Sequence, residues 1–353
     1  MAAGPDRDPP HGEAAAATAH QARAGPAGAP WTGPAYALGR RKAERLDRLA
    51  ELAATPADER GESLTREALR RLRRSPVALL GAAIVLLFVV VAVVGPFLAP
   101  YPATATVGLD QIRPDVIPGP SAEHWLGLDH QGRDQLSRML VGARQTLLVG
   151  IVATLLGFTV GALIGGVAGA ANALGGRVGR WLDSVLMRFI DMLLALPSLL
   201  LAASVAAILG RSLTTVMIAV GVVSVPIFAR LLRGSMIGQA HRDYVLAATA
   251  LGVRRRRVVL GHVLPNSLAP VIVQATLTLA TAIIEAAGLS FLGLGNPNSA
   301  IPEWGTMLAQ AQRWLSVRPE LAIYPAVAII ITALGFTLLG ESMREALDPK
   351  LRR

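Results

Sequence analysis

Six stretches of this chain are apolar over a length that can cross a lipid bilayer. A membrane-spanning helix needs roughly 20 predominantly apolar residues to cross about 30 Å of hydrocarbon, and its peptide groups must bond within the helix because lipid offers them no partner. The stretches that meet this requirement are residues 77–98, 146–171, 187–209, 213–235, 267–289 and 322–340. The sequence therefore predicts an all-α, polytopic membrane protein with about six transmembrane helices.

The composition agrees with a membrane protein and excludes several kinds of site. Of the 353 residues, 52% are hydrophobic and 16% are charged, and the mean hydropathy is +0.48, which argues against two soluble domains. There is no cysteine, so disulfides, thiolate metal sites and a cysteine nucleophile are excluded. The formal charge of +10 comes mainly from arginines beside apolar runs, which favours anionic lipid over nucleic acid as their partner.

Arginine clusters indicate the orientation of the chain in the membrane. One cluster, within residues 70–74, precedes the first apolar run, and Arg254–Arg257 precede the fifth. Cytoplasmic segments are enriched in Lys and Arg. Both clusters and both termini are therefore predicted to be cytoplasmic.

Residues 1–65 differ in composition from the rest of the chain. The part up to Gly39 is rich in Ala, Gly and Pro without a periodic apolar pattern, so the segment is predicted to be a disordered cytoplasmic extension. Residues 40–54 have the spacing of a short amphipathic helix. No signal peptide is expected, because the first apolar run begins only near Pro76. The transmembrane domain is predicted to occupy residues 66–353.

Prolines and glycines inside the apolar runs predict how the helices bend and pack. Pro197 and Pro226 each remove a backbone donor, so they are expected to kink the third and fourth spans. Such kinks either line a translocation path or fit neighbouring helices. Between Gly157 and Gly169, glycines recur at three- and four-residue spacing, which permits close packing of helices.

Two carboxylates inside the apolar runs require partners, because a charge near hydrocarbon is costly. Glu285, near the outer end of the fifth run, is expected to pair with Arg211 in the short outer turn. Asp191 lies near the cytoplasmic end of the third run, where snorkelling or a pair with Arg188 is sufficient.

The segment from Asp243 to Pro265, between the fourth and fifth runs, has the pattern of a helical hairpin. Asp243 is expected to cap a short helix, in which Ala247 and Ala248 permit close approach. Gly252 allows a sharp turn without a side-chain penalty, and a second short helix is expected to end at the break before Pro265. From these residues alone, the hairpin is either a docking element or a plain connector.

The spacing of this hairpin resembles the EAA loop of ABC-importer permeases. The residues that carry the resemblance are Asp243, Ala247, Ala248, Gly252, His262, Leu264 and Pro265. The resemblance implies a coupling helix that sits in a groove of a cytoplasmic ATPase subunit and transmits its closure to the spans. Leu246 stands where the family usually has glutamate, so an acidic contact at that position is in doubt, although Asp243 lies nearly a turn earlier. His262 replaces a common isoleucine.

Motifs outside the membrane narrow the resemblance to the dipeptide and oligopeptide permeases, and to the C-type subunit of a heterodimeric pair. Residues 125–138 and 289–308 resemble external segments of that subunit, and residues 346–349 resemble its C-terminal ending. The external candidate residues are Asp129, Gly132, Arg133, Asp134, Gly293, Gly295 and Trp304.

These external residues have more than one interpretation. Arg133 and Asp134 either contact a substrate-binding protein at the outer rim or brace the loops internally. Gly293 and Gly295 are expected to permit tight turns. The amphipathic ring of Trp304 suits the membrane surface.

The chain contains no motif that supplies energy or reaction chemistry. A GxxxxGK sequence followed by Ser or Thr and an HExxH sequence are both absent. Only His124 and His130 approach metal-ligand spacing, and they lie in an external loop. We therefore expect no catalytic residue, metal or cofactor, and we expect ATP to be hydrolysed by another chain.

The resemblance implies a type I ABC-importer permease in the bacterial inner (cytoplasmic) membrane, carrying di- or oligopeptides. Its implied partners are a second homologous permease, two cytoplasmic ATPases, an extracytoplasmic substrate-binding protein and membrane lipid, but not nucleic acid. One alternative is the same machinery carrying nickel or another small solute. Others are a stand-alone channel or secondary transporter, which needs charge pairs at the midplane, and a membrane enzyme acting on lipids or cell-wall precursors.

Overall fold

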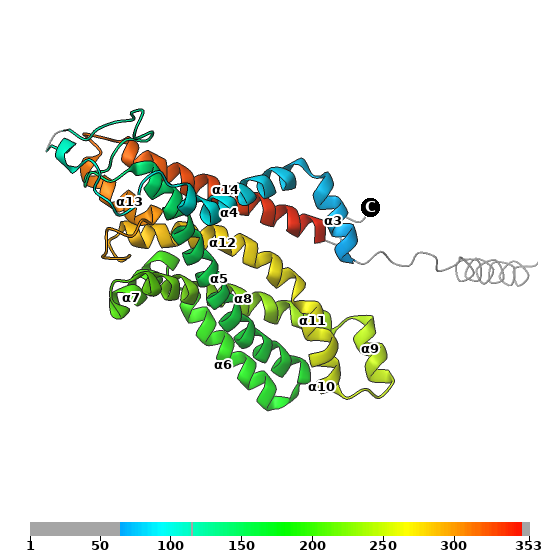
Figure 1. Cartoon of the computed structure of the whole chain (residues 1–353). Coiled ribbons are helices and arrows are strands. Elements are labelled where there is room, and N and C mark those ends of the chain that lie inside the picture. Colours follow the sequence, from blue (N-terminus) through cyan, green and yellow to red (C-terminus); the bar gives the residue numbers. More distant parts are fainter. Residues whose placement is uncertain (1–63, 114–115, 348–353) are drawn as a thin grey trace, which may run out of the picture. The chain divides into compact units, whose positions relative to one another are not determined.

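The computed structural model describes residues 64–113 and 116–347, which are largely helical (Figure 1). The elements are α3 (Leu64–Arg74), α4 (Pro76–Leu98), η1 (Leu109–Gln111), α5 (Gln135–Leu174), α6 (Gly176–Leu194), α7 (Ser198–Leu209), α8 (Leu213–Ala240), α9 (Asp243–Ala250), α10 (Arg255–Val258), η2 (Val259–Val263), α11 (Leu264–Ser267), α12 (Ala269–Phe291), α13 (Trp304–Ala311), η3 (Gln312–Trp314) and α14 (Glu320–Leu347). The expected disordered extension, the amphipathic helix at 40–54 and positions 348–349 of the C-terminal motif lie outside the described residues.

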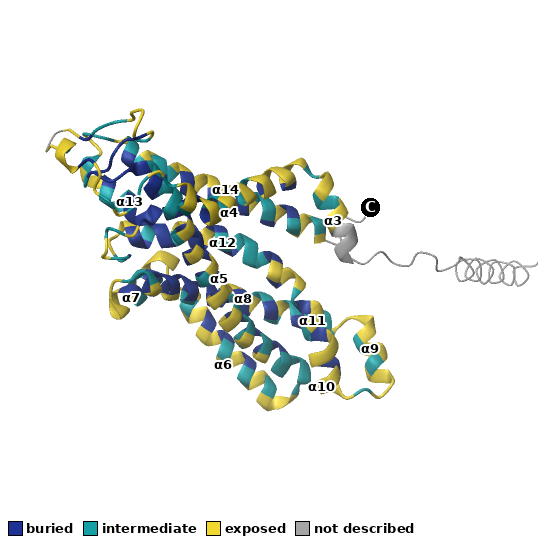
Figure 2. Ribbon diagram, in the orientation of Figure 1, coloured by how far each residue is buried: buried dark blue, intermediate teal, exposed yellow. Residues whose placement is uncertain are grey.

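Within residues 64–113 and 116–347, five helical segments are each long and apolar enough to cross a membrane: α4, α5, α8, the run Arg255–Phe291 that ends with α12, and α14. The bent pair α6 and α7 would provide a sixth. Figure 2 shows that α4 is largely exposed, and it presents apolar side chains such as Leu86, Val93 and Phe97, which suits contact with lipid. The all-α, polytopic prediction is confirmed.

The third expected span is divided by a sharp bend at Pro197. The helices α6 and α7 meet at 94°, and Pro197 is the N-cap residue of α7, so the proline interrupts the helix rather than only kinking it. Pro226 behaves differently, because α8 continues through it without a break. Close packing against α5 holds this part of α8 in place.

Glycines on α5 allow its backbone to contact α8. A β-carbon added at Gly157 would lie 2.5 Å from Ser224 Cβ, and one added at Gly165 would lie 2.2 Å from the carbonyl oxygen of Ala229. Residue numbers rise together along the two helices, so they run parallel. The predicted close approach at these glycines is present, and it fixes the register between the two spans.

We expect Gly165→Ala to lower the free energy of unfolding by about 2 kcal/mol, because the added methyl group forces α5 and α8 apart. Thermal unfolding of the detergent-solubilised protein measures this change. Gly166→Ala is the matched control, since its β-carbon would meet nothing closer than 3.6 Å, and alanine favours a helix by up to about 1 kcal/mol. Equal stability of the two variants would contradict the assigned packing.

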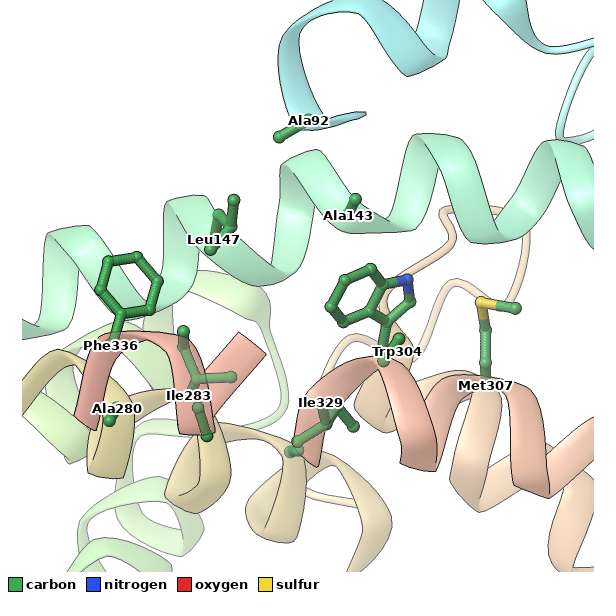
Figure 3. Packing of buried hydrophobic residues seen from close by; sticks show 12 residues of the cluster. Ala92, Ala143, Leu147, Ala280, Ile283, Trp304, Met307, Ile329 and Phe336 are labelled. Atoms are coloured by element: carbon green, nitrogen blue, oxygen red, sulfur yellow. The ribbon is translucent and has the colours of Figure 1, made fainter. Parts of the chain in front are cut away.

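A hydrophobic core joins α4, α5, α12, α13 and α14 around Trp304. Figure 3 shows the Trp304 ring pointing toward α5. Its indole Nε1 donates to the Met139 carbonyl at 3.0 Å, and Phe88 packs against the ring edge to face. The side chain is only 1% exposed. The expectation of a membrane-surface tryptophan is therefore wrong, because Trp304 begins α13 and is enclosed by four other helices.

Candidate functional site

The candidate site is the hairpin formed by α9 and α10, between α8 and α12. Figure 1 shows α9 standing apart from the packed helices α5, α6 and α8. The inner side of the hairpin joins a core cluster whose buried members include Phe228, Leu232 and Met236 of α8 and Val259 and Val263 of η2. The hairpin is therefore anchored on one side and open on the other.

A glycine turn ends α9. Gly252 has φ of +79°, donates its N–H to the Thr249 carbonyl at 3.0 Å, and is followed by Val253, whose N–H reaches the Ala248 carbonyl at 3.1 Å. This pair of bonds is the Schellman arrangement, in which glycine supplies the left-handed residue. A β-carbon at Gly252 would meet nothing within 4 Å, so backbone conformation alone requires glycine. The predicted turn is present.

The two faces of α9 differ in chemistry. Val245, Ala248 and Val253 pack against the core cluster beneath the hairpin, whereas Leu246 and Leu251 are 62% and 84% exposed. Ala247 is also exposed. The expected small-residue face is therefore divided, with Ala248 turned inward and Ala247 outward. The exposed face is an apolar ridge of the kind that a protein partner covers.

Asp243 does not cap α9, contrary to the sequence prediction. The N-cap residue is Arg242, whose side chain makes no capping bond, and Asp243 is the first helical residue. A carboxylate at that position still faces the positive end of the helix dipole. Asp243 is exposed to solvent, so its contribution to the stability of α9 is electrostatic.

The second helix of the hairpin does not break before Pro265. The helical path runs from α10 through a π-turn, in which the Leu264 N–H reaches the Val259 carbonyl, and Pro265 lies in the first turn of α11. A wider turn ahead of the proline relieves the clash that a proline makes with the preceding turn of an α-helix. His262 lies in this turn and is exposed.

Exposed arginines flank the apolar ridge. Arg254–Arg257 are all exposed, and Arg255 Nη1 donates to the Leu174 carbonyl at the end of α5 at 3.4 Å. Leu251, Gly252, Val253, Arg254 and Arg257 line a shallow pocket. An apolar ridge with a basic flank suits a partner groove that combines apolar and acidic groups.

The external residues Asp129 and Arg133 form a buried ionic cluster with Arg138. Asp129 Oδ2 lies 2.6 Å from Arg133 Nε and 3.3 Å from Arg138 Nε. The Ser299 carbonyl accepts from both guanidinium groups, at 2.7 and 3.2 Å. Gly132, which lies between Asp129 and Arg133 in the chain, has φ of +72°. These contacts correspond to internal bracing of the loops, one of the two interpretations of the sequence.

The neighbouring carboxylate, Asp134, caps α5. Its Oδ2 accepts from the Ser137 N–H and hydroxyl, both at 2.7 Å, and Oδ1 lies 2.9 Å from His124 Nδ1. His130 instead stacks against Trp314. Burial lowers the pKa of His130; nearby Asp129 raises it, and Arg133 and Arg138 lower it further.

The external glycines have different roles. Gly293 has φ of +80° and turns the chain after α12, as expected. Gly295 is not one of the described glycines that have a positive φ. A β-carbon there would lie 2.6 Å from Ser290 Oγ. Close approach, rather than a turn, therefore requires glycine at position 295.

The charged residues inside the spans have partners other than those expected. Glu285 interacts with Ser198 at the start of α7, and among the described residues it makes no ion pair with Arg211. Asp191 pairs with Arg230 of α8 at 2.5 Å, not with Arg188 of its own helix. Folding of α6 and α7 against α8 and α12 produces both contacts.

A further ion pair between α6 and α8 was not anticipated. Arg233 binds Asp183 through two contacts of 2.5 and 2.8 Å, and Asn172 of α5 donates to the same carboxylate at 2.8 Å. Asp183 is buried. The only sequence signal was a carboxylate on the apolar side of an amphipathic segment.

Comparison with known families and proteins gives consistent matches. The model of the family "binding-protein-dependent transport system inner membrane component" matches residues 157–353. The model of the N-terminal transmembrane domain of oligopeptide transport permease C matches residues 63–114.

Individual relatives cover most of the chain. A dipeptide transport system permease protein of Alkalihalophilus pseudofirmus is 41% identical over 287 residues, covering 81% of this chain and 90% of the relative. A glutathione transport system permease protein of Escherichia coli is 39% identical over 294 residues, covering 80% and 89%. A solved structure of the MetNI methionine ABC transporter in an inward-facing conformation aligns with a TM-score of 0.49 and 18% identity, over 60% of this chain and 96% of that one.

Proposed function

Because this chain belongs to the family of binding-protein-dependent transport system inner membrane components, we propose that it is one of two permease subunits in an ATP-driven importer of di- or oligopeptides. The exposed α9 ridge is the observation that carries this proposal, since it provides a docking element for a motor that the chain lacks. The dipeptide and glutathione permeases among its relatives support the peptide class. The chain itself is then non-catalytic.

The proposed partners divide between the two ends of the helices. Figure 1 shows the α9 hairpin and the loops before α5 at opposite ends of the long helices. The ridge of Leu246, Ala247 and Leu251, with the basic flank after it, docks on a cytoplasmic ATPase. The external loops face the substrate-binding protein, and the second permease completes the translocation path. Both termini then lie in the cytoplasm of a bacterium, beneath its inner membrane.

Reconstituted transport tests this function. We expect liposomes that contain this chain, the second permease and both ATPases to accumulate labelled dialanine only when ATP is inside and binding protein is outside. Uptake that persists without ATP or without binding protein would instead support the channel or secondary-transporter alternative. A preference for nickel over dialanine would reassign the cargo and leave the machinery unchanged.

Leu251→Asp is expected to weaken binding of the ATPase subunits to the permease about tenfold or more, because the variant places a charge at the most exposed apolar position of the ridge. Co-purification and titration of ATPase onto permease in detergent measure the effect. Leu109→Asp is the matched control, since Leu109 is also exposed, at 58%, but lies in the loops before α5. Equal loss of ATPase binding in both variants would reject docking at α9.

A further inference from the structure

Asp191 of α6 and Arg230 of α8 form an ion pair within two membrane-spanning segments. Arg230 Nη2 lies 2.5 Å from Asp191 Oδ1. Arg230 is ten residues before the end of α8 at Ala240, which places it ~15 Å along the helix from that end. Even so, the Arg230 and Asp191 side chains are 58% and 60% exposed.

An exposed ion pair at this depth is too costly to face lipid. Charged side chains within spans almost always face a protein interior or a water-filled cavity. The nearby pair of Asp183 and Arg233 is more enclosed, because the Asp183 side chain is 5% exposed. The contrast indicates that Asp191 and Arg230 face water, whereas Asp183 and Arg233 hold helices together.

A cavity of about 670 Å³ lies beside this pair, between α6, α8 and α12. Its walls are mostly apolar, and they include Leu194, Pro226, Ile227, Arg230, Gly234 and Gln274. The volume is in the range of small-molecule sites. Arg230 is the charged residue of this lining, so the cavity presents a cation to an occupant, with the anion Asp191 next to it.

The exposed face of α8 after Arg230 carries two glycines, which have no side chain. Gly234 and Gly238 are exposed, and a β-carbon at either would meet nothing within 4 Å. Glycine inside a helix costs about 1 kcal/mol relative to alanine, and no contact with the described part of the chain requires it there. Glycine at these two positions keeps side chains out of the groove beside Arg230, which would explain why glycine is present despite this cost.

We propose that this surface lines the path of the cargo and that the ion pair binds the two ends of a zwitterionic peptide. Arg230 donates charge-assisted hydrogen bonds to the terminal carboxylate, and Asp191 accepts hydrogen bonds from the terminal ammonium. Without cargo, the two side chains satisfy one another. When both ends of the peptide are free, its carboxylate replaces Asp191 as the partner of Arg230, and its ammonium replaces Arg230 as the partner of Asp191. A peptide with one blocked end leaves one of these two side chains without a charged partner. This inference rests on the proposed function.

Cysteine accessibility tests whether the surface is wet and contacts cargo. The chain has no cysteine, so Gly234→Cys introduces its only thiol. In the complex of both permeases and both ATPases, we expect this thiol to react with a charged methanethiosulfonate at least about tenfold faster than that of Leu163→Cys, an exposed position on α5. Dialanine should slow the reaction. A thiol at position 234 that reacts no faster than the control, or is not protected, would overturn the proposal.

The charge requirement is tested in the same assay, without binding protein, so that binding-protein selectivity does not contribute. With Gly234→Cys alone, dialanine should protect at about tenfold lower concentration than dialanine amide. Adding Arg230→Gln should weaken protection by dialanine about tenfold and remove the difference between the two peptides. Adding Arg188→Gln, which changes an exposed arginine three residues before Asp191, should leave the difference intact.

The outcomes separate this inference from the function beneath it. If wild-type liposomes do not accumulate dialanine with ATP and binding protein, the proposed function fails. If they do, but Arg230→Gln retains the preference for the free carboxylate, only the assignment of this ion pair fails. Loss of the preference in Arg188→Gln as well would also reject it, because removing either of two cations near Asp191 would then have the same effect and the ion pair with Arg230 would not be special.

Discussion

Replacing Asp129 with asparagine is expected to lower the free energy of unfolding by about 3–5 kcal/mol, the usual cost of leaving a buried charge without its partner. Asp129 Oδ2 binds both Arg133 Nε and Arg138 Nε. Its Oδ1 accepts the N–H groups of Gln131 and Arg133, at 2.8 and 2.9 Å. Asparagine has one acceptor oxygen, so in either orientation an amide N–H group faces a donor. Two buried guanidinium groups would also remain without a carboxylate.

Thermal unfolding in detergent measures this loss, with Asp110→Asn as the matched control. Asp110 is exposed in the same loop region, and a change there should stay within about 0.5 kcal/mol. Arg138→Gln should partly rescue Asp129→Asn, because removing one cation lowers the excess buried charge. A double mutant that shows only the sum of the two single effects would mean that the three residues do not act as a unit.

The features that sequence alone predicted are those that depend on neighbouring residues. Long apolar runs determine where helices cross the membrane, and the α9 turn needs only that Gly252 follows a short helix. The bend at Pro197 is also local, because the proline itself lacks the donor. The residues from Asp243 to Pro265 indicated a hairpin, and the resemblance to the EAA loop then suggested that this hairpin docks on an ATPase.

Two incorrect predictions are local, namely the cap at Asp243 and the helix break before Pro265, and the others concern contacts between distant segments. Trp304 has an amphipathic side chain, but α4, α5, α12 and α14 enclose it. Asp191 and Arg230 are 39 residues apart, and only the packing of α6 on α8 brings them together. Arg133 meets the Ser299 carbonyl across 166 residues. Single-sequence patterns contain no information about such pairings, so Arg188, the neighbour expected to pair with Asp191, is not its partner.

The division of α9 into two faces places Leu246 on the exposed side of the helix. The family's usual glutamate would project where Leu246 now lies, on the exposed side of the helix. With Leu251 also exposed, the docking that we propose at α9 depends on apolar area, and the negative charge on α9 is supplied by Asp243 at its start. An ATPase groove matched to this chain should therefore be more apolar at the position facing Leu246.

Gly252→Pro is expected to abolish ATP-driven uptake while leaving the protein inserted in the membrane. Proline fixes φ near −65°, whereas this position requires +79°. Proline also lacks the N–H that Gly252 donates to the Thr249 carbonyl. The turn must then reopen, and α9 loses its fixed placement on α10 and on the core cluster beneath it. Because Gly252 is exposed and outside the helices that pack in the membrane, the spans themselves should fold normally.

Gly252→Asn provides the matched control for this prediction. Asparagine tolerates the left-handed conformation better than other side-chain-bearing residues, keeps its N–H, and meets open space at this position. It should therefore retain most of the uptake. Protease protection and yield from membranes report insertion, and uptake of labelled dialanine reports coupling. Normal uptake by Gly252→Pro would show that the turn does not transmit motion. Loss of insertion in that variant would mean that the hairpin is needed for folding, and coupling would then have to be tested with Leu251→Asp.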